Sequence, residues 1–270
     1  MKTILAATDY STTANNALQF AASLANIFQA ELVLFNVYHP SSHVSNSLAT
    51  PESLEHIINN NETRLKKWAQ WAARKYQIDV EYVSKTVNTV GELENYVSEH
   101  QPDLVVMGMD SNLIGYKLFG NTTTAAIRRL KFPVLVVPND ILFKDIKKIL
   151  YACEVSYLSP NNHLDLLKEF TRKFEAELQV LHVKDKPNTS NDDQISKIDV
   201  IMENVEHTYN IVENSNVREG IIQGAEVWQA DLLVMVPHKA NFWELFLKGS
   251  ATRDIALRTR VPLLALPNVD

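Results

Sequence analysis

The residues most suited to bind a ligand or take part in a reaction lie in a polar segment between two apolar runs, at positions 104–107 and 134–137. The first run ends at Gly108, and the segment closes at Gly120, where a helix is expected to begin. A glycine loop that leads into a helix presents free backbone N–H groups and the positive end of the helix dipole to an anion. The chemistry that this segment could perform is therefore phosphate binding, although glycine spacing alone is weak evidence for it.

The same segment occurs a second time near the C-terminus. Residues 231–267 repeat the order of apolar run, polar loop, glycine and apolar run, with Gly249 in the place of Gly120. The beginnings of the two copies match as well, since residues 2–11 align with residues 147–156. These two correspondences, one at each end of a domain-sized unit, indicate an internal duplication.

The duplication predicts two domains, which we place at residues 1–140 and 146–270. The chain has 270 residues, 46% of them hydrophobic and 21% charged, which is enough apolar material for two cores. Its net charge of -6 argues against binding to nucleic acid. The single cysteine, Cys153, fits a reducing compartment, and no apolar run reaches the length of a membrane span. We therefore expect a cytoplasmic protein with neither a nucleic acid nor a membrane as partner.

Apolar runs alternate with helical patterns through each copy, which predicts crossover connections and a doubly wound, parallel α/β sheet. In the first copy, strands are expected at 4–7, 32–37, 78–83, 104–107 and 134–137, with helices that begin at Ser11 or Thr12, at Pro51 and near Thr89. In the second copy, strands are expected at 149–153, 178–183, 211–213, 232–236 and 263–266, with helices at about 161–174, 195–209 and 217–228.

Three candidate site residues follow expected strands of the first copy. Ligands of doubly wound sheets bind outside the carboxyl ends of the strands, where the strand order reverses. Asp9, Val37 and Gly108 all lie at such ends. This convergence favours a site there, yet each residue also has a plain structural explanation. Asp9 could contact a ligand or simply stabilise a helix N-terminus, and Gly108 could serve a phosphate or only the geometry of a turn.

With these residues in view, the chain resembles a tandem universal stress protein over essentially its whole length. The opening segment ILAATDYS and the repeated strand–glycine loop–helix–strand block carry the resemblance. It implies two five-stranded parallel sheets of strand order 3-2-1-4-5, which pair through their last strands, here Val134–Val137 and Leu263–Leu266. It also implies ATP as a ligand, with Asp9 contacting the ribose or adenine and Val37 packing on the base. No metal is expected beyond nucleotide-bound magnesium.

The phosphate motif of the ATP-binding members, G-x2-G-x9-G-[S/T], is only partly kept in the first copy. Gly108 matches the first glycine and Gly120 the third, but Ser111 replaces the second, and the loop between Ser111 and Gly120 is one residue short. Asn121 stands where the motif asks for Ser or Thr. The resemblance still assigns two hydroxyls that could reach a phosphate, those of Thr122 and Thr123.

The second copy departs from the motif differently. Gly249 and Ser250 keep the end of the motif at the helix start, but Val236 and Lys239 replace both early glycines. Glu154 stands in the place of Asp9. We therefore expect ATP in the first copy rather than the second, with the alternative that Lys239 supplies a positive charge where the backbone no longer can.

Catalysis has little support in the sequence. There is no Walker lysine pattern and no nucleophile elbow, and the eight histidines show no metal-ligand spacing. We therefore expect a non-enzymatic stress-response regulator, although slow ATP hydrolysis could accompany binding. The alternative is an interaction module that has lost ATP binding in both copies. The sequence leaves open a further homodimer and the identity of a partner protein.

Overall fold

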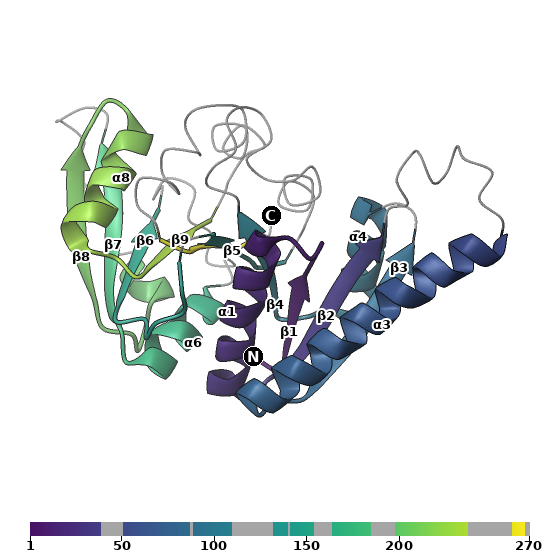
Figure 1. The fold of residues 1–270 in the computed structure, drawn as a ribbon. Coiled ribbons are helices and arrows are strands. Elements are labelled where there is room, and N and C mark those ends of the chain that lie inside the picture. Colours follow the sequence, from purple (N-terminus) through teal and green to yellow (C-terminus); the bar gives the residue numbers. More distant parts are fainter. Residues whose placement is uncertain are drawn as a thin grey trace.

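The computed structural model describes residues 1–38, 51–86, 89–109, 132–139, 141–153, 164–184, 198–236 and 261–267. Within them, ten strands form one continuous sheet in the order β3-β2-β1-β4-β5-β10-β9-β6-β7-β8 (Figure 1). The strands of the first half are β1 (Thr3–Ala7), β2 (Glu31–Tyr38), β3 (Val80–Thr86), β4 (Leu104–Met109) and β5 (Val134–Pro138). Those of the second half are β6 (Lys148–Ala152), β7 (Glu177–Lys184), β8 (His207–Glu213), β9 (Leu232–Met235) and β10 (Leu263–Ala265).

Each half of the sheet is parallel and has the order 3-2-1-4-5, so the predicted doubly wound α/β fold is confirmed. The two halves meet where β5 and β10 pair in antiparallel fashion, with Leu264 opposite Leu135. Both strands are fully buried. Because a buried strand edge must have its backbone groups hydrogen-bonded, this ladder removes an edge from each half-sheet.

Helices cover both faces of the sheet. Those described are α1 (Thr12–Phe28), α3 (Pro51–Tyr76), α4 (Thr89–His100), α6 (Asp165–Phe174) and α8 (Val217–Trp228). One apolar core packs the sheet against α1, α3 and α6, and a second core packs the opposite face against α4 and α8. Neighbouring strand residues alternate between the cores, so that Ile4 belongs to the first and Leu5 to the second. Both cores run through both halves of the chain.

The helix ends follow local chemistry that is only partly visible in the sequence. Ser11 caps α1 as predicted, because its Oγ accepts a hydrogen bond from the Ala14 amide at 3.1 Å. The residue after each described helix has a positive φ, between 44° and 55°, in the left-handed region that favours glycine. None of these residues is glycine; they are Gln29, Gln77, Gln101, Glu175 and Gln229.

The helix predicted at about 195–209 is confirmed at residues 198–201, and its C-terminal part is wrong. The helical turn at residues 198–201 ends soon afterwards, and Asn204 takes a φ of 65°. Residues His207 to Tyr209, predicted as helix, belong to β8, which pairs with β7 along its whole length. The free energy gained by pairing β8 with β7 outweighs the weak helical preference of these residues. Asn204 marks the end of the helical turn, because asparagine tolerates the left-handed region.

Aromatic side chains join the two halves on the face that α1 and α6 share. Phe143, in the connection between the halves, packs edge-on against Phe20 of α1 at a centroid distance of 4.9 Å. Phe28 of α1 lies 5.1 Å from Phe170 of α6. Asn16 donates hydrogen bonds to the carbonyl oxygens of residues 138 and 141, at 2.9 and 2.8 Å. The short connection is therefore held on the α1 surface, and the halves pack closely.

Candidate functional site

The candidate site lies at the carboxyl edge of the first half-sheet, where the strand order reverses between β1 and β4. In the ladders, Ala7 pairs with Phe35 of β2, and Ala6 pairs with Val106 of β4. Asp9 lies two residues after Ala7, and Val37 lies two residues after Phe35. Gly108 lies two residues after Val106, so all three residues are at the same edge of the sheet. The structure thus brings together the ends of the three strands that carry these predicted residues.

Asp9 forms the turn that leads from β1 into α1. Its Oδ1 accepts a hydrogen bond from the Ser11 amide at 2.9 Å, while Thr8 Oγ1 accepts one from the Tyr10 amide at 3.0 Å. Tyr10 between them has a φ of 65°. The described role of Asp9 is therefore local, since it stabilises the start of α1. Its side chain is exposed, so a carboxylate remains presented at the edge.

Gly108 has a packing reason for being glycine. A Cβ built on it would lie 2.5 Å from the carbonyl oxygen of Thr13 and 2.7 Å from its carbonyl carbon. Real Cβ atoms do not approach backbone this closely, so the first turn of α1 can lie against β4 only because residue 108 has no side chain. This reason differs from both explanations considered from the sequence, the phosphate contact and the turn geometry.

The second half has a valine at the position of Gly108. Val236, directly after β9, occupies the position that Gly108 has in β4. Its side chain is buried in the core on the α6 face. The described part of the corresponding helix, α6, has 10 residues against 17 in α1. The described residues of the two halves therefore differ at the edge where a ligand would bind.

A buried polar network lies beside the site, and sequence reasoning missed it. Asn36 of β2 donates to the carbonyl oxygen of Thr8 at 2.7 Å. Asn61 of α3 donates to Asn36 Oδ1 at 2.8 Å and to Ser84 Oγ of β3 at 3.0 Å. The Tyr10 hydroxyl closes the network by donating to the carbonyl oxygen of Asn61 at 3.1 Å. The signal was the single asparagine in the run LVLFNVY, because a buried amide needs hydrogen-bond partners.

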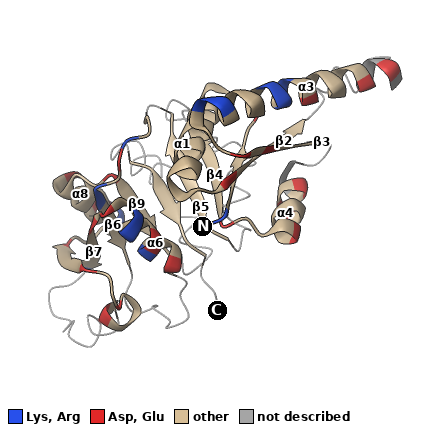
Figure 2. Ribbon diagram, turned by 90° about the horizontal axis from the view of Figure 1, so that it is seen from below, with Lys and Arg blue, Asp and Glu red and all other residues tan. Residues whose placement is uncertain are grey.

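A cation lies over Tyr10 beside this edge. The Arg64 guanidinium is 4.1 Å from the centroid of the Tyr10 ring, and Trp68 meets the same ring edge-on at 5.9 Å. Burial raises the pKa of the Tyr10 hydroxyl to about 12, against the opposing effect of Arg64. The hydroxyl is therefore a neutral hydrogen-bond donor at any physiological pH. Figure 2 shows that Lys and Arg gather on the C-terminal half of α3.

Most of the predicted phosphate-binding residues lie outside the described part of the chain. They are Ser111, Gly120, Asn121, Thr122 and Thr123 of the first copy and Gly249 and Ser250 of the second. Glu154 and Lys239 lie outside it too. The structure therefore describes the sheet edge and the first glycine, and the remainder of the loop stays a prediction.

The described residues include neither a metal-binding cluster nor a membrane-spanning helix. They contain no group of three or more His, Cys, Asp or Glu side chains placed to hold a metal ion. Across the same residues, every helix falls short of the length and apolar character needed to cross a membrane.

Known proteins share the architecture described above. Residues 1–138 and 200–267 match the model of the universal stress protein family. A universal stress protein from Archaeoglobus fulgidus has a similar structure, with a TM-score of 0.79 at 17% identity over 98% of each chain. One from Pseudomonas aeruginosa gives a TM-score of 0.59 at 14% identity, over 98% of this chain and 93% of that chain. No curated protein matches the sequence. At these identities the solved structures show a shared fold.

Proposed function

Because the chain belongs to the universal stress protein family, we infer that it is a non-catalytic stress-response regulator whose first domain binds ATP. The ATP-binding domain is residues 1–140, and the site is the carboxyl edge of β1, β2 and β4. Residues 146–270 form a degenerate second domain that packs against the first and holds no nucleotide. The protein acts in the cytoplasm, and the response to ATP is read by a protein partner.

The observation that supports ATP binding is the common edge of Asp9, Val37 and Gly108. An exposed carboxylate can accept hydrogen bonds from ribose hydroxyls or an adenine amino group, and a half-buried valine offers an apolar surface to a base. The phosphates would lie on the loop that starts at Gly108, close to the N-terminus of the helix expected from Gly120. Magnesium would arrive with the nucleotide.

Each remaining loop residue has a role in this proposal. Ser111 and Asn121 replace motif residues, and their side chains would reach the phosphates as donors. Thr122 and Thr123 would add hydroxyls at the helix start. In the second domain, Gly249 and Ser250 keep this end of the motif only, so the pair is assigned a structural role there. No residue of the described edge is placed as a general base for hydrolysis.

A second candidate function is a nucleotide-free interaction module. It is favoured by the close approach of Thr13 to Gly108, because this contact explains the first glycine without any ligand. Burial of Val236 at the equivalent place shows that the fold persists when that glycine is lost. In this alternative the paired half-sheets serve only to present surfaces, either to a partner protein or to a second copy of the chain.

The experiment that separates the two is direct. Small molecules released by acid from freshly purified protein are identified, and the melting temperature is measured with and without ATP and magnesium. A ligand of the native state must raise the melting temperature by mass action. We expect the shift in the native chain and in Glu154→Ala, and its loss in Asp9→Ala. Absence of both released nucleotide and any ATP-dependent shift in the native chain would leave the interaction module as the function.

A further inference from the structure

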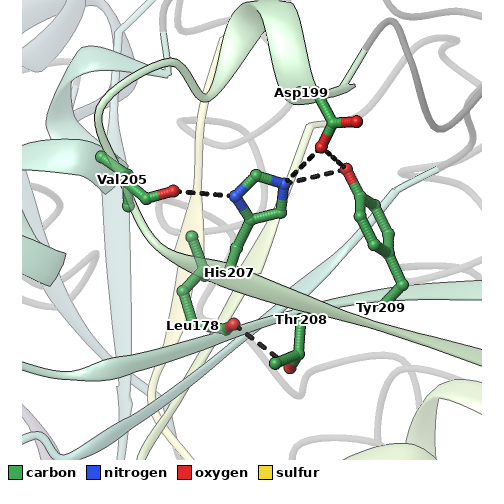
Figure 3. A network of polar contacts seen from close by, with 6 residues as sticks. All are labelled: Leu178, Asp199, Val205, His207, Thr208 and Tyr209. Carbon is green, nitrogen blue, oxygen red and sulfur yellow. Dashed lines mark hydrogen bonds and ion pairs between the residues drawn. The ribbon is translucent and has the colours of Figure 1, made fainter.

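A polar cluster in the second half of the sheet joins the helical turn at residues 198–201 to the edge strand β8 (Figure 3). His207 Nδ1 lies 2.8 Å from the carbonyl oxygen of Val205, and His207 Nε2 lies 2.8 Å from the Tyr209 hydroxyl. The same Nε2 is 3.2 Å from Oδ1 of Asp199. Tyr209 donates its hydroxyl proton to that carboxylate oxygen at 2.7 Å.

The number of protons in this cluster fixes the charge of the imidazole. A backbone carbonyl only accepts hydrogen bonds, so His207 Nδ1 must carry a proton to bind Val205. The Tyr209 hydroxyl has a single proton, which the Asp199 carboxylate takes. His207 Nε2 then faces the oxygen atoms of Tyr209 and Asp199, and it can bind either only if it also carries a proton. All contacts are satisfied together by an imidazolium.

The neutral imidazole leaves one contact unsatisfied. If His207 Nε2 lacks a proton, it must accept the Tyr209 proton, and nothing then bonds the hydroxyl oxygen to the carboxylate 2.7 Å away. The lone pair of Nε2 also faces Asp199 Oδ1 at 3.2 Å, which is repulsive. Asp199 would therefore move away from β8. Its side chain is 56% exposed, so water can receive it, whereas that of His207 is only 9% exposed and stays in place.

The turn that Asp199 belongs to covers part of the core. Ile198, Met202 and Val205 are at most 8% exposed and pack on the face that α6 also covers. Asn204, with its left-handed φ, turns the chain back into β8. The contact between Asp199 and the imidazole thus ties the beginning of this segment to the strand that follows it. Loosening that contact weakens the cover over three apolar side chains.

The side chains around His207 define the charges that it meets. Burial raises the pKa of the Tyr209 hydroxyl, and the hydrogen bond to Asp199 adds to this effect, so Tyr209 stays protonated. Opposite His207, β7 places the uncharged Leu178. Cys153, just after β6, contributes to the raised pKa of Tyr209. The acids of the turn itself, Glu203 and Glu206, are exposed.

We propose that Asp199, His207 and Tyr209 form a pH-sensitive latch on the segment from residue 198 to residue 206. The latch is closed when His207 is charged and released when it is neutral. The closed form binds one proton more than the released form, so falling pH favours it and rising pH opens it. Imidazole is the side-chain group whose charge ordinarily responds to changes in cellular pH.

The test is hydrogen exchange of the full-length protein followed by mass spectrometry at about pH 5.5 and about pH 8, corrected for intrinsic exchange rates. We expect the amides of residues 198–206 to exchange about 3- to 10-fold faster at the higher pH, as suits a partly exposed charge pair. Peptides from α1 serve as the internal reference and should show no such ratio. Equal corrected rates at both pH values in residues 198–206 would overturn the proposal.

Two variants locate the effect. Asp199→Asn keeps the shape of the side chain and can donate its amide to a neutral imidazole, so it should flatten the pH dependence. The matched control, Glu203→Gln, removes an exposed carboxylate from the same turn and should keep the dependence. Retention of the full ratio in Asp199→Asn would refute the latch, as would its loss in Glu203→Gln. Because Asp199 is largely exposed, this substitution tests the proposal without threatening the fold.

Discussion

Asp103 and Asp231 occupy the same position in the two halves of the sheet and make the same pair of hydrogen bonds. One carboxylate oxygen of Asp103 accepts from the amides of Lys2 and Thr3, at 2.6 and 2.9 Å. One oxygen of Asp231 accepts from the amides of Lys147 and Lys148, both at 2.9 Å. In each half the aspartate lies directly before the fourth strand, β4 or β9. Its hydrogen bonds hold the start of the first strand, β1 or β6. The duplication is therefore preserved in polar contacts as well as in apolar pattern.

Asp103→Ala and Asp231→Ala should each destabilise the protein by about 1–3 kcal/mol. Either change leaves two amides at a strand start without their acceptor, and hydrogen bonds to a charged group are stronger than neutral ones. Urea unfolding at neutral pH measures the effect. Glu226→Ala, at an exposed position of α8, is the control and should change stability by less than about 0.5 kcal/mol. A neutral effect of both aspartate changes would contradict the structural role assigned to these hydrogen bonds.

Stability should fall in acid partly through Asp231. Burial acts to raise the pKa of this carboxyl group, but the hydrogen bonds from Lys144 and from the amides of Lys147 and Lys148 outweigh it, and the pKa is lowered. A lowered folded-state pKa gives stability that is present above the unfolded-state value of about 3.9 and is lost as pH falls through the folded-state value. Asp231→Asn removes this contribution. Between about pH 5 and about pH 3 the free energy of unfolding should therefore fall less steeply in the variant, which urea titrations at each pH would reveal.

The left-handed residues at the helix ends offer a gain in stability. Gln229, after α8, has a φ of 55°, a conformation that costs a residue with a Cβ about 1–2 kcal/mol and glycine almost nothing. After the greater chain entropy of unfolded glycine is subtracted, Gln229→Gly should stabilise the protein by about 0.5–1 kcal/mol. Gln223→Gly, inside the same helix, should instead destabilise it by about 1 kcal/mol. The melting temperatures of the two variants test this. Equal shifts of the melting temperature in the same direction would rule out the backbone explanation.

What the sequence predicted well depends on local, repeated signals. The strand positions, the duplication and the start of α1 at Ser11 or Thr12 rest on apolar runs and a capping side chain that can be recognised within a few residues, whereas the strand order came from the family resemblance. The first part of β8, residues 207–210, was missed because its structure comes from pairing with β7, a contact between distant segments. The role of Gly108 was missed for the same reason, since the Thr13 backbone that excludes a side chain there belongs to another element. Asn36 gave a signal, a polar residue in a buried strand, but its partner Asn61 could not be inferred from sequence.

Gly108→Ala separates the packing role of this glycine from any role in ligand binding. The new Cβ would meet the Thr13 backbone at 2.5 Å, and because both elements are buried, α1 must shift away from β4. We expect a loss of about 1–3 kcal/mol in nucleotide-free protein, as in other overpacked cores. Gly224→Ala is the matched control, because its Cβ would meet the end of the Leu181 side chain, which can rotate aside. If Gly108→Ala kept the unfolding free energy of the native chain without nucleotide and lost only its response to ATP, the glycine would serve the ligand and the packing explanation would fail.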